Sequence, residues 1–211
     1  MSLIISEITV HSRLHQLKFK KVLDIMDHSV VLKNDERTLR PVRLDDAEFI
    51  VRLRNQSYAK NCVNDTSIDV ERQRQWIREY LRRDNEYYWI IETPDGEPFG
   101  TTSLYHYDAD KNQIESGRWV ELKGEKYMYN LFKSAVQFNG FAFDVLKVDR
   151  VVFDVVDTNR RVIRYHQSYG AESIGIEKSA VVLGGVPHDV MWMQITREKW
   201  PQIRAFLERM S

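Results

Sequence analysis

The sequence predicts an α/β fold with a mixed sheet, and three observations support this prediction. Short apolar segments bounded by turn residues recur along the chain, which is typical of strands. Segments with apolar residues at helical spacing separate several of these strands. The length of 211 residues and the hydrophobic content of 43% fit one globular domain, with or without an appended segment.

A change of pattern near residue 36 divides the chain into an N-terminal extension, residues 1–36, and a main domain, residues 37–211. Apolar side chains in residues 7–33 follow a mixed pattern that predicts a helix and then a short strand. We expect this extension to pack on the main domain.

The first half of the main domain predicts a strand, two helices and three antiparallel strands. Residues 38–44 form the first strand, and Asp45 and Asp46 favour the start of a helix that runs to about residue 58. The polar residues 65–67 open a second helix that we expect to end near residue 85. Strands follow over residues 87–91, 98–107 and 114–122, and a turn at residues 93–96 joins the first two.

The second half predicts a long helix over residues 125–146, whose apolar residues cover more than one face. Residues 151–156 are almost continuously apolar, as in a strand buried on both sides. A short helix over residues 159–169 ends at Gly170, a residue suited to the position after a helix. Two closing strands, 173–183 and 188–195, meet at Gly184 and Gly185, and a last helix begins near residue 199.

The composition excludes several classes of function. Lysine and arginine total 31, aspartate and glutamate also total 31, and the net charge of zero argues against binding nucleic acid or an anionic membrane surface. Glu7 interrupts the only apolar run near the N-terminus, so we expect neither export nor membrane insertion. The single cysteine, Cys62, cannot form an internal disulfide, which suits the cytoplasm.

Common catalytic signatures are absent from the sequence, including the phosphate-binding G-x-x-x-x-G-K-[ST], the dinucleotide-binding G-x-G-x-x-G and the zinc-binding H-E-x-x-H. His11 and His15 stand four residues apart, but no nearby carboxylate supplies a third ligand. We therefore expect no bound metal.

One segment carries a family resemblance. Residues 141–159 begin with Phe-Ala-Phe and end in a strand followed by Asn159, and the next helix contains Tyr165-His166 before Gly170. This segment resembles the GNAT (GCN5-related N-acetyltransferase) superfamily, and the resemblance covers roughly residues 37–195. It implies a mixed, mostly antiparallel sheet flanked by helices, acetyl-CoA as the acyl donor, and direct attack by an acceptor amine.

A narrower resemblance concerns the acceptor. Leu53-Arg54-Asn55, the spacing from Ser67 to Trp76, and the segment 99–103 resemble the bacterial nucleotide-aminosugar N-acetyltransferases. The resemblance implies a small-molecule acceptor, a nucleotide-linked amino sugar, and it leaves a homodimer open. Ribosomal-protein N-terminal acetyltransferases share much of this pattern and remain an alternative.

The cofactor site departs from the family pattern. GNAT enzymes carry [Q/R]-x-x-G-x-[G/A] where the long helix begins, because backbone N–H groups there approach the acyl-CoA pyrophosphate. This chain lacks those glycines, which raises a second alternative, a catalytically silent binding module. Backbone amides do not depend on side-chain identity, so we still expect acetyl-CoA to bind. The expected cofactor-binding residues are Trp119, Val120, Leu122, Lys126, Tyr129 and Asn159.

The resemblance also implies catalytic residues. His166 stands where many members have a tyrosine that protonates the departing thiolate, and an imidazole with a pKa near about 6.5 is partly protonated at neutral pH. Glu115 and Glu121, on the strand before the long helix, are expected to take the proton of the acceptor amine.

The expected substrate-binding residues lie on the first helix and on the third strand of the main domain. Arg54 is expected to bind the diphosphate of the nucleotide through its guanidinium, with Asn55 beside it. Tyr105 and His106 form a polar aromatic cluster where the family's acceptors sit.

Overall fold

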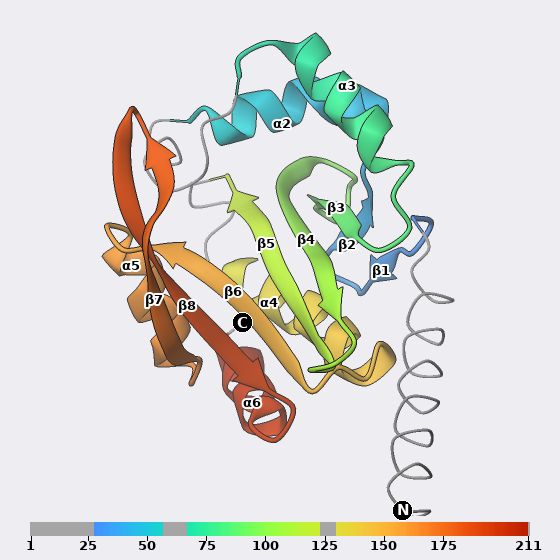
Figure 1. The fold of residues 1–211 in the computed structure, drawn as a ribbon. Helices are drawn as coiled ribbons and strands as arrows, with labels where there is room; N and C mark the ends of the chain where they lie inside the picture. Colours follow the sequence, from blue (N-terminus) through green and yellow to red (C-terminus); the bar gives the residue numbers. More distant parts are fainter. Residues whose placement is uncertain (1–27, 57–66, 123–129, 211) are drawn as a thin grey trace, which may run out of the picture.

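The computed structural model describes residues 28–56, 67–122 and 130–210. Within these ranges the chain forms an eight-stranded sheet with the order β1-β2-β3-β4-β5-β6-β8-β7 (Figure 1). Among the strands of the described ranges, only β5 and β6 pair in parallel. The expected mixed, mostly antiparallel sheet is confirmed. The strands are β1 (Leu32–Lys33), β2 (Thr38–Pro41), β3 (Tyr87–Glu92), β4 (Pro98–Asp108), β5 (Gln113–Glu121), β6 (Arg150–Val156), β7 (Glu172–Leu183) and β8 (Val186–Thr196).

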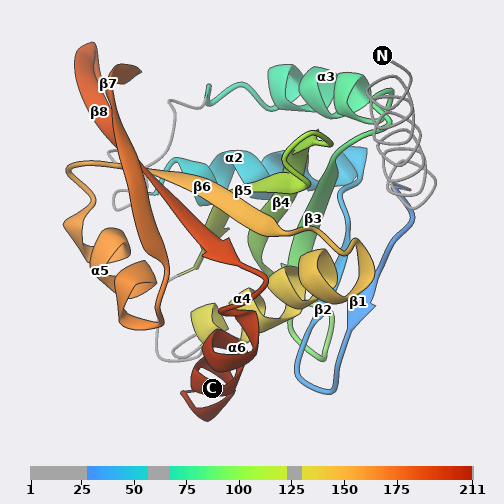
Figure 2. The same cartoon turned by 60° about the horizontal axis from the view of Figure 1, so that its bottom comes forward.

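Helices cover both faces of the sheet (Figure 2). A short 3-10 turn, η1 (Leu44–Asp46), leads into α2 (Ala47–Arg54), which packs with α3 (Val70–Tyr80) over one face. The other face is covered by α4 (Asn130–Gly140) with its π-helical continuation η3 (Phe141–Val145), by α5 (Arg160–Ser168) and by α6 (Trp200–Arg209).

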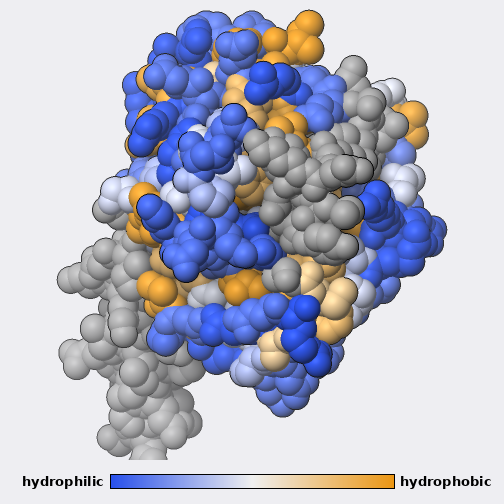
Figure 3. Space-filling model, turned by 180° about the vertical axis from the view of Figure 1, so that it is seen from behind, coloured by the Kyte–Doolittle hydropathy of each residue, from blue (hydrophilic) through white to orange (hydrophobic). Residues whose placement is uncertain are grey.

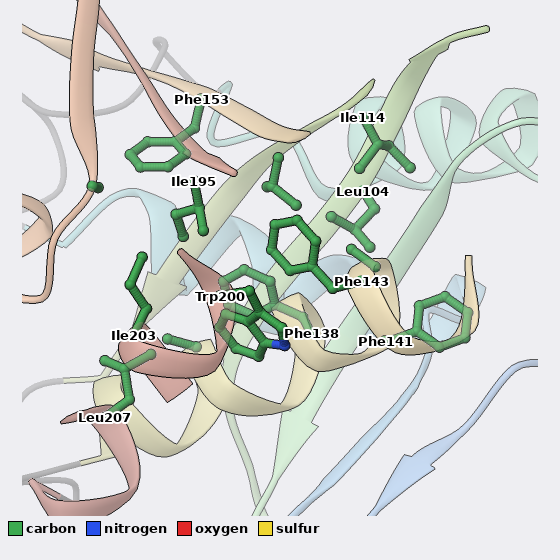
Figure 4. Close-up of a cluster of buried hydrophobic side chains, with 14 of the residues drawn as sticks. Leu104, Ile114, Phe138, Phe141, Phe143, Phe153, Ile195, Trp200, Ile203 and Leu207 are labelled. Carbon is green, nitrogen blue, oxygen red and sulfur yellow. The ribbon is translucent and has the colours of Figure 1, made fainter. Parts of the chain in front are cut away.

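The main core lies between the sheet and the helices α4 and α6 (Figure 4). Phe143 stacks on Trp200 with their ring centroids 5.2 Å apart, which joins the end of α4 to α6. A second, smaller apolar cluster lies under α2 and α3, where Leu53 and Ile77 are fully buried. One face of the sheet is therefore covered by α4, α5 and α6 and is called here the α4 face. The other face is covered by α2 and α3 and is called the α2 face.

The two parallel strands separate soon after they begin to pair. Residues 113–115 of β5 are in register with residues 150–152 of β6, and beyond them the strands diverge (Figure 1). From residue 116 to 121, β5 is paired with β4 on one side and has no strand partner among the described residues on the other. This fork opens the middle of the sheet.

A bulge in β5 lies at the fork. The register between β4 and β5 shifts between Ser103, opposite Gly117, and Thr101, opposite Val120. Arg118, inside the bulge, has a φ of 52°, which is a left-handed conformation that non-glycine residues seldom adopt. The extra residue leaves Gly117 and Arg118 on the same face of the sheet, both against Tyr105, so the alternation of side chains shifts by one residue after the bulge.

Several element boundaries differ from the sequence-based expectation. The second helix begins at Val70, because Asp69 caps it and accepts from the N–H groups of Glu71 and Arg72 at 2.8 and 3.3 Å. The helix ends at Tyr80. Asp46 occupies the N-cap position of α2, but its side chain makes no capping hydrogen bond to the helix, and its carboxylate instead accepts from Arg40 at 2.7 Å. The first residues of the expected long helix, 125–129, lie outside the described residues.

The described end of the N-terminal extension contacts the main domain. Its strand β1 pairs with β2, and the carbonyl of Val30 accepts from the indole N–H of Trp89 at 2.9 Å. The His28 ring lies against Tyr80, with Nδ1 2.8 Å from the tyrosine hydroxyl. The helix expected earlier in the extension lies outside the described residues.

The surface seen from behind is mostly hydrophilic, with small separated hydrophobic areas (Figure 3). None of the helices in the described ranges has the length and hydropathy needed to cross a membrane.

Candidate active site

The α4 face of the fork is lined by aromatic rings. Trp119 points to this face and lies edge-on to Phe138 at 5.0 Å between centroids. His166, from α5, is 4.4 Å from Phe153 of β6 and 6.2 Å from Trp119 of β5, again between centroids. His166 therefore lies across the gap that separates the two diverging strands.

Glu121 positions the Trp119 indole. Its Oε1 accepts from the indole N–H at 2.8 Å, and the side chain is buried on the α4 face. Burial raises the pKa of Glu121, while the charge of the buried Arg37 opposes this shift. Arg37 also donates to the Ser134 hydroxyl of α4 at 2.8 Å. Glu121 thus belongs to a buried polar group that supports the wall of the fork, and its predicted role as a base remains untested.

The environment of His166 changes its expected chemistry. Its side chain is buried, and its Nδ1 hydrogen-bonds the Tyr169 hydroxyl. Burial lowers the pKa of His166 from 6.5 to about 3. The expectation of a partly protonated imidazole at neutral pH is therefore wrong, because no described acid compensates the loss of water around the ring. A neutral imidazole can still donate a hydrogen bond through its N–H group. That His166 donates such a hydrogen bond to the departing thiolate stays a prediction.

The α2 face of the fork carries a tyrosine and an arginine. The Tyr105 hydroxyl lies over Gly117, where a Cβ would collide with it. The Arg118 guanidinium lies 4.4 Å from the centre of the Tyr105 ring and donates to Glu86 at 2.7 Å. Rings of Trp76 and Tyr88 flank the same guanidinium at 5.0 and 5.6 Å. These contacts fix Tyr105 at the point where β5 leaves β6.

Glu115 is on the same α2 face. It is opposite Tyr105 in the β4–β5 register, and its Oε2 is 3.0 Å from Nδ1 of the exposed His106. Burial, followed by the negative charge of Glu115, raises the pKa of Tyr105. The structure thus brings together three predicted site residues, Glu115, Tyr105 and His106, and places Glu121 on the opposite face.

The predicted diphosphate ligand lies at the end of α2. Arg54 is half-buried, and burial lowers its pKa, with Tyr88 and Arg118 among the charged or titratable groups that act on it. Asn55 follows the last turn of α2 and donates its side-chain amide to the Val51 carbonyl at 2.9 Å. Arg54 therefore faces the same aromatic group as Arg118, whereas Asn55 stabilises its own helix end.

The predicted cofactor-binding residues lie along the fork or beyond it. Val120 packs under α2 and α3, and the Leu122 N–H donates to the Phe99 carbonyl at 2.7 Å. Asn159 caps α5 and accepts from the Val162 N–H at 3.4 Å. Lys126 and Tyr129 lie outside the described residues.

Sequence reasoning missed several residues around the fork. Asp154 is on β6, where its pKa is raised by burial and then by the charge of Glu115. The sequence did contain a signal for Asp154, because it is the only charged residue within the apolar segment 151–156. Arg118 and Glu86 gave no such signal, since their partners lie far apart in the chain.

Comparison with known proteins decides the family. The model of the acetyltransferase (GNAT) domain matches residues 37–172. The chain belongs to the GNAT acetyltransferase family. It is therefore an N-acetyltransferase, an enzyme of the acyl-transferring class EC 2.3.1, and GNAT enzymes use acetyl-CoA as the donor. The search of curated proteins gave no match.

Solved structures of other GNAT proteins share the fold. A GCN5-related N-acetyltransferase from Brucella melitensis aligns with a TM-score of 0.75 and 16% identity, over 88% of this chain and 87% of that one. FdhC, described as a nucleotide-linked sugar GNAT, gives 0.69 and 26%, over 86% and 98%. A spermidine N-acetyltransferase from Vibrio cholerae in complex with CoA and spermine gives 0.68 and 17%, over 80% and 99%.

Two features of this GNAT enzyme fit an acyl-CoA at the fork. The edge of β5 over residues 116–121 lacks a strand partner in the described chain, so its backbone groups can pair with the amides of a pantetheine arm. The Tyr165 hydroxyl is buried with no hydrogen-bond partner among the described residues, close to Trp119 and His166. An amide-bearing ligand in the fork would supply hydrogen-bond partners for the backbone of this strand edge and for the Tyr165 hydroxyl. Among the described residues, no group of His, Cys, Asp or Glu is arranged to hold a metal ion.

Proposed function

We propose that this N-acetyltransferase acetylates the amine of a nucleotide-linked amino sugar by direct attack on acetyl-CoA. The observation that carries the proposal is the separation of charge on the α2 face. Carboxylates of Glu115 and Asp154 lie at the fork, and the guanidinium of Arg54 lies at the end of α2. An acceptor with an ammonium at one end and phosphates at the other matches this arrangement.

FdhC supports the same acceptor class. It is described as a nucleotide-linked sugar GNAT, and at 26% identity it aligns with 86% of this chain. The spermidine N-acetyltransferase has an acceptor without phosphate. A polyamine would bring no anion to the Arg54 guanidinium at the end of α2, which favours the nucleotide sugar.

The roles of the residues follow from the face on which each lies. On the α2 face, Glu115 accepts the proton of the acceptor amine, and Tyr105 borders the passage beside Gly117. On the α4 face, the backbone after residue 116, together with Trp119, holds the acyl-CoA, and neutral His166 donates a hydrogen bond toward the departing sulfur. The amine and the thioester then meet through the fork.

The experiment is an acceptor screen with acetyl-CoA, in which free thiol release is monitored. The amines are UDP-glucosamine, dTDP-linked amino sugars, free glucosamine, spermidine and a peptide with a free N-terminus. We expect the nucleotide-linked amines to react with the highest kcat/KM and free glucosamine to react weakly, because it lacks the diphosphate. A higher kcat/KM for the peptide would instead support a protein N-terminal acetyltransferase.

A thermal melt separates an enzyme from a silent binding module. A ligand that binds only the native protein at about a hundredfold excess over its Kd stabilises it by about 2.7 kcal/mol. We expect acetyl-CoA at millimolar concentration to raise the melting temperature. A raised melting temperature without thiol release on any amine would identify a binding module, and no shift would contradict acetyl-CoA binding at the fork.

A further inference from the structure

Two carboxylates face the α2 side of the fork from its opposite walls. Glu115 is the last residue of β5 in register with β6, opposite Val152. Side chains two residues apart on a strand point to the same face, so Asp154 lies on the face shared by Val152 and Glu115. The opening between the strands therefore begins between one carboxylate on β5 and one on β6.

Two other carboxylates, Glu115 and Glu177, act electrostatically on Asp154. After burial, the charges of Glu115 and Glu177 act on it, and no lysine or arginine of the described chain is among its electrostatic partners. Burial, followed by the charge of Glu115, raises the pKa of Asp154. Glu177 itself accepts from the Trp192 indole N–H at 2.9 Å, which occupies one of its oxygens.

Other titratable or charged side chains near Glu115 and Asp154 come from β4, β5 and α2, and they differ in exposure and in what they contact. Burial and Glu115 keep Tyr105 protonated, and Arg118 holds its ring at 4.4 Å. Arg54 lies farther toward α2, near Tyr105. His106 is different, because its Nδ1 is 3.0 Å from Glu115 and its side chain is 76% exposed. It connects the half-buried carboxylate to the solvent.

We propose that Asp154 and Glu115 together form the base that removes the proton from the acceptor ammonium, and that His106 passes this proton to the solvent. The ammonium gives one proton to the carboxylate pair, and the neutral amine attacks the thioester carbonyl carbon. The C–N bond forms and the C–S bond breaks. The nitrogen loses its second proton, which ends on the sulfur of CoA, and the first proton leaves through Glu115 and His106. The inference rests on the amine acetylation proposed above.

The kinetic test compares Asp154→Asn and Glu115→Gln with the parent enzyme, with UDP-glucosamine as the amine. General base catalysis contributes about 10² to 10⁴ in rate, so we expect kcat/KM for the amine to fall by about that factor. The KM for acetyl-CoA should stay unchanged, because the pair faces away from the α4 side. Glu172→Gln, which removes an exposed carboxylate of β7 paired with Lys199, is the matched control and should behave as the parent.

The pH profile distinguishes a base from an electrostatic binding role. In the parent, kcat/KM should rise with pH and reach a plateau once Asp154 has lost its proton. In Asp154→Asn it should rise about tenfold per pH unit without that plateau, because only amine deprotonated in solution reacts. A variant that changes only the KM for the amine, with the parent's profile, would overturn the assignment.

His106→Gln tests the exit of the proton. We expect a lower kcat in weakly buffered solution and recovery when imidazole is added, because imidazole can accept the proton from Glu115 in place of the side chain. A kcat equal to that of the parent in weak buffer would overturn the role of His106.

A measurement without acceptor separates this inference from the choice of substrate. Infrared difference titration of the free protein should show a protonated carboxyl band that is absent in Asp154→Asn. If no tested amine is acetylated but the band is present, the substrate proposal fails and the assignment of Asp154 as a proton-binding carboxylate stands. If UDP-glucosamine is acetylated and both carboxylate variants keep the parent's rate, the base assignment is wrong.

Discussion

The buried imidazole of His166 should make the stability of this protein depend on pH. The folded state holds His166 with a pKa of about 3, below its ordinary value of 6.5. Above pH 6.5 both states have a neutral imidazole, and stability is at its full value. As the pH falls below 6.5, the unfolded chain binds a proton that the folded protein does not bind, so stability is lost until the pH approaches 3.

The size of the loss follows from the two pKa values. Each pH unit within this window costs about 1.4 kcal/mol. Between pH 7 and pH 5 only the part below the unfolded pKa counts, which gives about 2 kcal/mol from this single residue. The burial of the ring leaves little solvent to reduce the effect.

Urea denaturation at pH 7 and pH 5 measures this contribution when the parent is compared with His166→Gln. Glutamine does not titrate, and its carbonyl can still accept from the Tyr169 hydroxyl. The other titrating groups are common to both proteins and cancel in the comparison. The parent should lose about 2 kcal/mol more than the variant over this pH range.

The refuting result is an equal loss of unfolding free energy in both proteins. It would mean that the ring is hydrated or paired with an acid in solution. The comparison does not depend on how stable His166→Gln is at pH 7, because each protein serves as its own reference.

Three further predictions concern the fork. Arg54→Ala should raise the KM for a nucleotide-linked amine more than it changes kcat, because a phosphate contact is present in the ground and transition states alike; unchanged kinetics would contradict it. Gly117→Ala should destabilise the protein by about 1 to 3 kcal/mol, and by less in a Tyr105→Phe background, where the colliding hydroxyl is absent. Urea denaturation of the parent, the two single variants and the double variant measures both losses, and an equal loss in the two backgrounds would contradict the prediction. His166→Phe should lower kcat about tenfold to a hundredfold at unchanged acetyl-CoA affinity, and His166→Tyr should recover part of the loss; a full kcat in the Phe variant would exclude any role beside the thiolate.

The order of helices and strands was predictable because it depends on local periodicity. The strand at 150–156 and the helix that ends before Gly170 follow from runs of apolar residues and from one glycine with a φ of 103°. The end of α3 was not predictable, because Tyr80 turns inward to bind the Tyr88 N–H at 2.8 Å, a contact made outside the helix.

The sequence by itself determined the order of the strands and helices, the family resemblance and the presence of candidate acids and bases. Only the tertiary structure decided which of them face each other. Glu115 and Glu121 belong to one strand, yet the bulge at Arg118 and the parting of β5 from β6 send them to opposite faces with different partners. Asp154 meets Glu115 only through the parallel register of two strands separated by the long helix. Charge, burial and pKa depend on such contacts, and a contact between distant segments leaves no local pattern in the chain.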